Sequence, residues 1–175
     1  YSTMQLFETI ESLQSALSGA AANTLGFVLT MGNLHAGHLS LVSRARGEHD
    51  LVVVSIFVNP LQFGANEDLD SYPRTLDADT AALIAAGCDF LFLPSAAELY
   101  GDDMQASTRV QVPELGTHYC GASRPGHFDG VTTVVTKLFN IVQPDAAYFG
   151  LKDYQQFSII RKMVDDLALP VSVHG

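Results

Sequence analysis

Cysteine, basic side chains and long apolar runs are all scarce in this sequence. Its two cysteines, Cys88 and Cys120, are too few for a disulfide framework, so we expect a reducing, cytoplasmic environment. The apolar runs stay short of the roughly 18 residues that a transmembrane helix needs. Near the N-terminus, no positively charged segment precedes an apolar stretch, as a secretory signal would require.

The chain is strongly acidic. Nine Lys and Arg stand against 19 Asp and Glu, which gives a net charge of −10. This balance argues against a nucleic-acid-binding surface, because such surfaces obtain affinity from many Lys and Arg contacts. A small anionic ligand stays compatible with it, because the local field of a pocket can oppose the net charge.

The composition and the apolar pattern indicate a globular α/β domain. Hydrophobic residues make up 47% of the 175 residues and charged residues 16%, and this length fits one domain. Short apolar runs alternate with longer helical stretches. The runs predict five strands, at residues 24–30, 51–58, 88–93, 145–149 and 170–174.

Helical stretches lie between these strands. Residues 38–46 follow the first strand, and residues 77–86 precede the third, with Gly87 placed as a C-terminal stop. Two further helices are marked by apolar faces, which comprise Val131, Val134, Val135, Leu138 and Val142 in one and Phe157, Ile160, Met163, Val164 and Leu167 in the other. Apolar strands that alternate with amphipathic helices predict a doubly wound parallel sheet. The long connections 59–75 and 94–128 are expected to be functional loops or to carry small extra elements.

A doubly wound sheet also predicts where a ligand binds. Its first strand lies beside its fourth, the strand order reverses there, and ligands bind at the carboxyl ends of the strands beside this switch point. The first strand runs into residues 30–38 and the fourth into residues 150–153. We therefore expect these two loops to meet at one ligand site.

Two imidazoles stand where the first strand turns into a helix. His35 and His38 are three residues apart, so they share one side of the first helical turn. A helix start binds anions through its unpaired N–H groups and its dipole, and Gly32 and Gly37 allow close backbone approach. A surface pair that only satisfies backbone groups is the alternative, and a zinc site would need further ligands that the sequence does not identify. The position directly after a buried strand favours phosphate binding.

The motif around these histidines resembles a known family. The segment reads Thr30-Met31-Gly32-Asn33-Leu34-His35-Ala36-Gly37-His38. It is similar to the signature of the pantothenate synthetases (pantoate–β-alanine ligases), within the nucleotidylyltransferase-like group that carries a His-x-Gly-His motif. The resemblance continues in order through residues 54–63, 72–75, 123–128 and 152–156. His-x-Gly-His alone is moderately specific, whereas five blocks in order are strongly so.

The resemblance implies a Rossmann-like fold and a two-step ligase reaction. Pantoate would attack the α-phosphate of ATP to give pantoyl adenylate and pyrophosphate, and the amine of β-alanine would then displace AMP to form pantothenate. Mg²⁺ is expected to bridge the phosphates, through protein ligands that the sequence does not identify. A homodimer without nucleic-acid or membrane partners is expected. Residues 1–175 would be the ATP- and pantoate-binding domain, without the C-terminal lid domain of the family, and would therefore bind weakly and turn over poorly.

Residue roles follow from the same resemblance. His38 would be the catalytic donor to phosphate oxygens with His35 beside it, and Lys152 would face the leaving pyrophosphate. Gln62 and Gln156 would bind pantoate through their amides. The ATP contacts would come from Met31, Gly32, Asn33, Leu34, His35, Ala36, Gly37, His38, Gly150, Leu151, Lys152 and Asp153.

Three residues depart from the family pattern. Leu29 replaces a proline, whereas Leu151 and Cys120 replace glutamates close to the expected site. The loss of two carboxylates puts efficiency in doubt. Arg124 and His127 either approach the anionic ligand or have a structural role in their loop. Two other functions stay open: a His-x-Gly-His nucleotidylyltransferase acting on another substrate, and a non-catalytic nucleotide-binding module.

Overall fold

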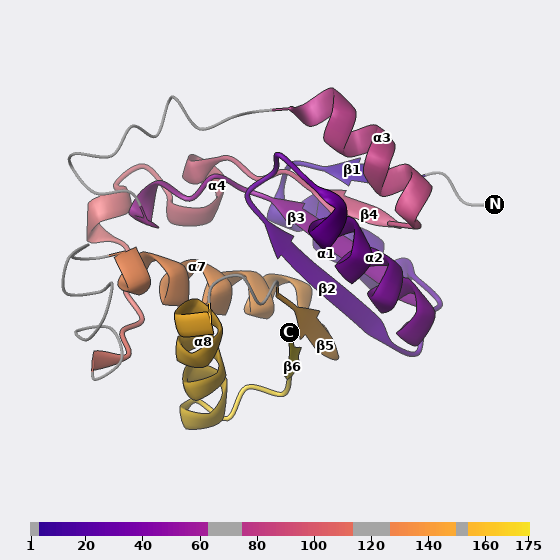
Figure 1. The fold of residues 1–175 in the computed structure, drawn as a ribbon. Helices are drawn as coiled ribbons and strands as arrows, with labels where there is room; N and C mark the ends of the chain where they lie inside the picture. The colour runs from indigo at the N-terminus through magenta and orange to yellow at the C-terminus, as the bar shows by residue number, and fades with distance from the viewer. Residues whose placement is uncertain (1–3, 63–74, 114–126, 150–153) are drawn as a thin grey trace.

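The computed structural model describes residues 4–62, 75–113, 127–149 and 154–175 (Figure 1). Its six parallel strands form one sheet in the order β1-β4-β3-β2-β5-β6. The strands are β1 (Gln5–Phe7), β2 (Leu25–Thr30), β3 (Leu51–Ile56), β4 (Phe90–Phe92), β5 (Ala146–Tyr148) and β6 (Ser172–His174). The predicted α/β class and the parallel, doubly wound sheet are confirmed.

The predicted neighbours in the sheet are also confirmed. Val28 of β2 is in register with Val54 of β3 on one side and with Tyr148 of β5 on the other. The strand order therefore reverses between β2 and β5, at the switch point that the sequence predicts. The sequence does not predict the sixth strand, β1. It has three residues, two of them exposed, and pairs with β4 at the edge, so it lacks the apolar run that marks a buried strand.

Helices cover both faces of the sheet (Figure 1). On one face lie α2 (Ala36–Glu48) and α3 (Leu76–Ala86), and on the other lie α1 (Ile10–Gly19), α7 (His127–Val142) and α8 (Tyr154–Asp166). The long connections carry α4 (Ala96–Tyr100) and the short 3₁₀ turns η1 (Pro60–Gln62) and η2 (Met104–Ala106). Adjacent residues of a strand serve opposite faces: Phe27 packs with the α7 side and Val28 with the α2 side. In the described part of the chain, no helix is both long enough and apolar enough to cross a membrane.

Most helix predictions hold, with two corrections. Gly87 ends α3 with φ 95°, a left-handed conformation that favours glycine, and all five predicted apolar residues of α7 are buried. The prediction that Leu167 lies on the buried face of α8 is wrong: it lies beyond the last helical residue and is 51% exposed. The chain leaves the helix at Ala168 with φ 54°, and Leu169 packs against the core instead. Helix α1 is the second correction, because the sequence pattern does not predict it.

Three aspartates each precede a strand directly: Asp50, Asp89 and Asp145. We term them the amino-end aspartates. Each accepts hydrogen bonds from N–H groups at the start of a neighbouring strand. These bonds join Leu25 N to Asp145 Oδ2 (2.7 Å), Val52 N to Asp89 Oδ2 (2.9 Å), and Asn23 N and Thr24 N to Asp50 Oδ2 (3.0 and 3.3 Å). They satisfy backbone donors at the point where the strand ladder begins.

Candidate functional site

The loop from β2 to α2 lies at the carboxyl end of the sheet and has an unusual backbone. Gly32 and Asn33 are consecutive residues with positive φ, 87° and 52°. Such a pair turns the following N–H groups toward one side, which makes a concave site for an anion. Thr30 fixes the start of the loop, because its Oγ1 accepts from Gly32 N at 3.2 Å and donates to Ser55 O at 2.9 Å.

A buried carboxylate occupies this concave side. Asp79 of α3 accepts from Asn33 N through Oδ2 and from Leu34 N through Oδ1, both at 2.9 Å. Thr75 Oγ1 donates to the same Oδ1 at 3.1 Å. Asp79 is 3% exposed and lies in the first turn of its helix, where the dipole favours negative charge. The loop is therefore held by a charge from a neighbouring element.

His35 and His38 cap α2 reciprocally. His35 is the N-cap and its Nδ1 accepts from Gly37 N at 3.0 Å, while His38 Nδ1 accepts from His35 N at 3.2 Å. The two rings lie with their centroids 4.0 Å apart. An Nδ1 that accepts places the proton of a neutral imidazole on Nε2, so we assign the Nε2–H tautomer to both. Each ring thus satisfies a backbone N–H and also keeps a donor on its other nitrogen.

Glycine at position 37 is required by this arrangement. A Cβ added to Gly37 would lie 2.8 Å from Cε1 and 3.0 Å from Nδ1 of His35. The imidazole would have to move, and the hydrogen bond that it accepts would be lost. The His-x-Gly-His spacing therefore has a local physical reason, which is the seat of the first ring on the backbone of the helix start.

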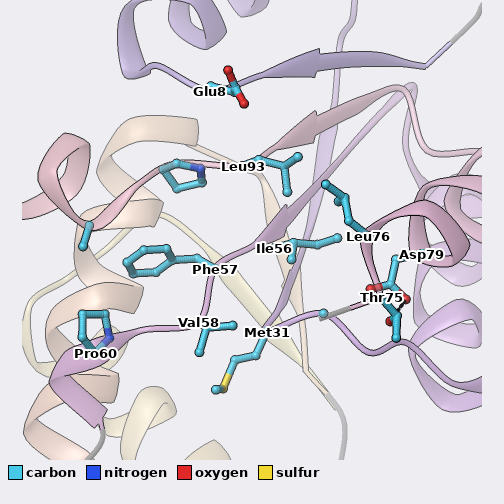
Figure 2. A pocket seen from close by; sticks show the side chains of 13 residues that line it. Glu8, Met31, Ile56, Phe57, Val58, Pro60, Thr75, Leu76, Asp79 and Leu93 are labelled. Carbon is cyan, nitrogen blue, oxygen red and sulfur yellow. Dashed lines mark hydrogen bonds between the residues drawn. The ribbon is translucent and has the colours of Figure 1, made fainter. Parts of the chain in front are cut away.

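A cavity of ≈ 460 Å³ opens beside this loop (Figure 2). Figure 2 shows Thr75 and Asp79 on one side of it and Pro60 on the other, with Phe57, Val58 and Met31 between them. The full lining is Glu8, Met31, Gly32, Ile56, Phe57, Val58, Pro60, Thr75, Leu76, Asp79, Leu93, Pro94 and Ala96. The cavity thus lies at the carboxyl ends of β2, β3 and β4, on the β3 side of the motif loop. Two predicted ATP-binding residues, Met31 and Gly32, contribute to its wall.

The second predicted loop is not among the described residues. Gly150, Leu151, Lys152 and Asp153 follow β5, whose register places its end beside the end of β2. The expectation that both loops converge on one ligand therefore stays a prediction. Arg124 and Cys120 also lie outside the described residues, as does the side chain of His127. Leu29 is half-buried in β2 and packs against the core.

The two glutamines predicted to bind pantoate lie on elements that pack around α7. Gln62 ends η1, which contacts α7, and its side chain lies outside the described part of the structure. Gln156 is half-buried in the first turn of α8, which also contacts α7. The two elements that carry these glutamines therefore pack against the same helix, α7.

Sequence reasoning missed a buried amide that fixes η1. Asn59 is 1% exposed and follows β3; its Nδ2 donates to Gly130 O at 3.0 Å. Its Oδ1 accepts from Tyr100 Oη at 2.6 Å and from Leu61 N at 3.3 Å. Burial raises the pKa of Tyr100, which keeps its hydroxyl a donor. The signal in the sequence was an Asn-Pro pair directly after a buried strand.

Asp79 was missed as well, and the described residues hold no ready metal site. The sequence signal for Asp79 was the one charged residue in the stretch 78–86, which is otherwise apolar except for Thr80. Within the ranges that the structure describes, no group of three or more His, Cys, Asp or Glu side chains is placed to hold a metal ion. A zinc centre at His35 and His38 therefore has no further ligand in this part of the chain.

Comparison with known proteins identifies the family. The model of the pantoate–β-alanine ligase family matches residues 5–175. A pantothenate synthetase of Saccharophagus degradans is 61% identical over 172 residues, which are 97% of this chain and 61% of the relative. One from Pseudomonas putida is 58% identical over 174 residues, or 98% of this chain and 61% of the relative. The chain belongs to the pantoate–β-alanine ligase family and spans about three fifths of the length of these relatives.

Solved structures agree with this assignment. A crystal structure of pantothenate synthetase from Thermus thermophilus matches with a TM-score of 0.92 at 52% identity, over 98% of this chain and 61% of the other. The pantoate–β-alanine ligase of Francisella tularensis, complexed with β,γ-ATP and β-alanine, matches with a TM-score of 0.91 at 40% identity, over 97% of this chain and 65% of the other. The Rossmann-like, nucleotidylyltransferase-like fold implied by the sequence motifs is confirmed.

Proposed function

We propose that this member of the pantoate–β-alanine ligase family forms the ATP- and pantoate-binding domain of an ATP-dependent ligase. The ligase condenses pantoate with β-alanine to pantothenate through pantoyl adenylate, and it releases AMP and pyrophosphate. One observation carries the proposal: two imidazoles cap a helix start after β2, and each accepts a backbone N–H through its Nδ1. The complex of the Francisella tularensis relative with β,γ-ATP and β-alanine supports the choice of ATP and β-alanine as substrates.

The first step is a nucleotidyl transfer. A carboxylate oxygen of pantoate forms a bond to the α-phosphorus of ATP, and the bond from that phosphorus to pyrophosphate breaks. As these bonds change, negative charge increases on the phosphate oxygens. The Nε2–H groups of His38 and His35 donate hydrogen bonds to these oxygens. The N-terminal end of α2 adds its positive dipole. One well-aimed donor of this kind contributes roughly 3–4 kcal/mol to the transition state.

The second step consumes the adenylate. The amine of β-alanine bonds to the acyl carbon, the bond from that carbon to the oxygen of AMP breaks, and the amine proton passes to water. Lys152 would neutralise the pyrophosphate released in the first step, while Gln62 and Gln156 orient pantoate through their amides. Met31 to His38 and Gly150 to Asp153 would surround ATP. Mg²⁺, when bound, would neutralise negative charge on the phosphates of ATP.

Calorimetric titration of the 175-residue chain with ATP and with pantoate tests the site. We expect His38→Ala to weaken ATP binding by about tenfold or more, and Gln156→Ala to weaken pantoate binding. His49→Ala is the matched control, because His49 caps the opposite end of the same helix and contacts Tyr148 Oη at 2.8 Å. Unchanged ATP affinity in His38→Ala would remove that residue from the site.

Pyrophosphate release tests the reaction. The chain is joined to the C-terminal portion of the Saccharophagus degradans relative and assayed with pantoate and with other hydroxy acids. Release that depends on pantoate supports the ligase. Equal release with other acids would indicate a different nucleotidylyltransferase, and ATP binding without release would indicate a non-catalytic module.

The assembly and location complete the proposal. We place the protein in the cytoplasm as a homodimer, as the resemblance implies, without nucleic-acid or membrane partners. Sedimentation velocity at micromolar concentration checks the dimer, and a single monomeric species would contradict it.

A further inference from the structure

We propose that Asp79 is a positioning residue for the nucleotide loop: its buried carboxylate holds residues 32–34 so that His35 and His38 keep their donor geometry. This inference rests on the proposed function, since it concerns the same imidazoles. Asp79 has no expected contact with ATP itself. It would act through the backbone of the loop.

The carboxylate of Asp79 fits the backbone of the loop that it binds. Gly32 and Asn33 adopt left-handed conformations, and the N–H groups of Asn33 and Leu34 converge on the two oxygens of one carboxylate at 2.9 Å each. An amide side chain offers only one acceptor oxygen, so it cannot accept both N–H groups with separate atoms. The conformation of the loop is therefore matched to an ionised acid.

Few bonds separate Asp79 from the two imidazoles. Leu34, which donates to Asp79, is followed directly by His35, whose N–H donates to His38 Nδ1 at 3.2 Å. The His35 ring in turn accepts from Gly37 N at 3.0 Å. A rotation of the 34–35 peptide would break the hydrogen bond to His38 Nδ1. The proton of that imidazole could then occupy either ring nitrogen. Fixing Leu34 N therefore restrains the residue next to His35, whose N–H binds one ring and whose side chain carries the other.

Burial of the Asp79 carboxylate costs free energy that its hydrogen bonds offset. A buried charge is expensive unless it is paired and hydrogen-bonded, and Asp79 is 3% exposed. Its bonds to Asn33, Leu34 and Thr75 all come from the motif loop or from the start of its own helix. The carboxylate thus joins α3 to the loop, and it does so at the wall of the cavity beside Met31.

The test compares three variants of the chain. Asp79→Asn removes the charge and one acceptor. Asp77→Asn makes the same chemical change at an exposed position of the same helix start, away from the loop. Leu83→Ala empties a fully buried site on the same helix and controls for loss of stability alone. Thermal unfolding records the stability of each variant.

Two measurements distinguish the positioning role of Asp79 from the proposed ligase function. Long-range ¹⁵N–¹H NMR spectra of the ligand-free chain report the tautomer of each imidazole, and titration with ATP reports binding. We expect Asp79→Asn to move both imidazoles from Nε2–H toward a mixture of tautomers. We also expect it to weaken ATP binding by about tenfold, because the loop loses one hydrogen bond to a charged group. Asp77→Asn and Leu83→Ala should leave both readouts unchanged, although Leu83→Ala lowers the melting temperature.

Unchanged tautomers and ATP affinity in Asp79→Asn would overturn the inference, and so would an equal response in Leu83→Ala. If Asp79→Asn does not fold, Thr75→Ala takes its place, because it removes the hydroxyl donor to Oδ1 and keeps the charge. A smaller shift of the same two readouts is then expected, and no shift overturns the inference. Failure of the unaltered chain to bind ATP would refute the proposed function, while the tautomer measurement would still decide the role of Asp79.

Discussion

The two ends of the β-sheet use the same interaction for different purposes. At the amino end, Asp50, Asp89 and Asp145 accept N–H groups from the starts of neighbouring strands. At the carboxyl end, Asp79 accepts N–H groups from the loop that carries His35. In both places a carboxylate satisfies backbone donors that the regular hydrogen-bonding pattern leaves unpaired.

The difference lies in the backbone that each carboxylate binds. The strands at the amino end keep extended conformations, and Arg46 forms an ion pair with Asp89 there, so the contacts add to a regular ladder. The loop at the carboxyl end has two consecutive residues with positive φ, and its conformation depends on the carboxylate. We conclude that the amino-end aspartates mainly stabilise the sheet, whereas Asp79 mainly shapes a site. Four substitutions or modifications test this comparison.

The largest effect is expected for Asp89→Ala at the amino end. The change removes the acceptor for Val52 N and the partner of Arg46, whose side chain is 34% exposed. Hydrogen bonds to charged groups contribute roughly 1.5–3 kcal/mol each, and we expect the free energy of unfolding to fall by about 2–3 kcal/mol. Urea denaturation measures the fall, and ATP titration of the folded variant should match the unaltered chain. A parallel loss of ATP affinity would contradict the conclusion that Asp89 mainly stabilises the sheet.

A smaller loss of stability is expected for Gly32→Ala at the carboxyl end. Gly32 has φ 87°, and an added Cβ would lie 3.1 Å from Ile56 Cγ2. A left-handed conformation costs a residue with a Cβ roughly 1–2 kcal/mol, so the loop should move toward another conformation. We expect weaker ATP binding together with a modest fall in the urea midpoint. Wild-type ATP affinity would show that the turn is not needed for binding.

Gly37→Ala should change binding without lowering stability. Alanine is favoured over glycine in a helix by up to about 1 kcal/mol, which offsets the displacement of the His35 ring from its seat. We expect a free energy of unfolding within about 0.5 kcal/mol of the original, and ATP binding weaker by about tenfold, or about 1.4 kcal/mol. Calorimetry and urea denaturation of the same sample give both values. An equal loss in the free energies of unfolding and of ATP binding would instead mean that Gly37 mainly stabilises the fold.

The smallest effect concerns Cys88, which is 5% exposed and lies between α3 and β4 at the amino end. Burial raises the pKa of its thiol from the ordinary value of 9.0 to about 12. The neutral thiol is thus favoured in the folded chain. Its contribution to stability is full below pH 9 and is lost as the pH rises from about 9 toward about 12.

Alkylation provides the measurement. The reactive form is the thiolate, so iodoacetamide at about pH 8 should modify Cys88 far more slowly than it modifies a cysteine peptide. Mass spectrometry of separated peptides distinguishes Cys88 from Cys120, and the urea-unfolded chain is the control. Rapid labelling of Cys88 in the folded chain would mean that the amino end opens more readily than its hydrogen bonds indicate.

Much of the architecture could be predicted because the responsible signals are local. Buried strands are apolar runs, and the face of α7 appears as apolar residues at helical spacing, of which Val134 and Leu138 are examples. The position of Gly87 at the end of α3 follows from its conformational freedom. By contrast, β1 has only three residues and owes its conformation to pairing with β4, so no run marks it. The prediction for Leu167 was wrong because the apolar spacing typical of a helix continues in the sequence beyond the residue where α8 ends.

Local sequence patterns were enough to predict the α/β class, the neighbouring positions of β2 and β5, and the family, because short-range periodicity and consecutive motif residues suffice for these. By contrast, the carboxylate that holds the motif loop and the amide that fixes η1 could be identified only from the three-dimensional fold. Asp79 lies 45 residues from the Leu34 N–H that it accepts, and Asn59 lies 71 residues from the Gly130 carbonyl to which it donates. A polar side chain can satisfy many backbone groups equally well, and the fold alone determines which of them comes within hydrogen-bonding distance.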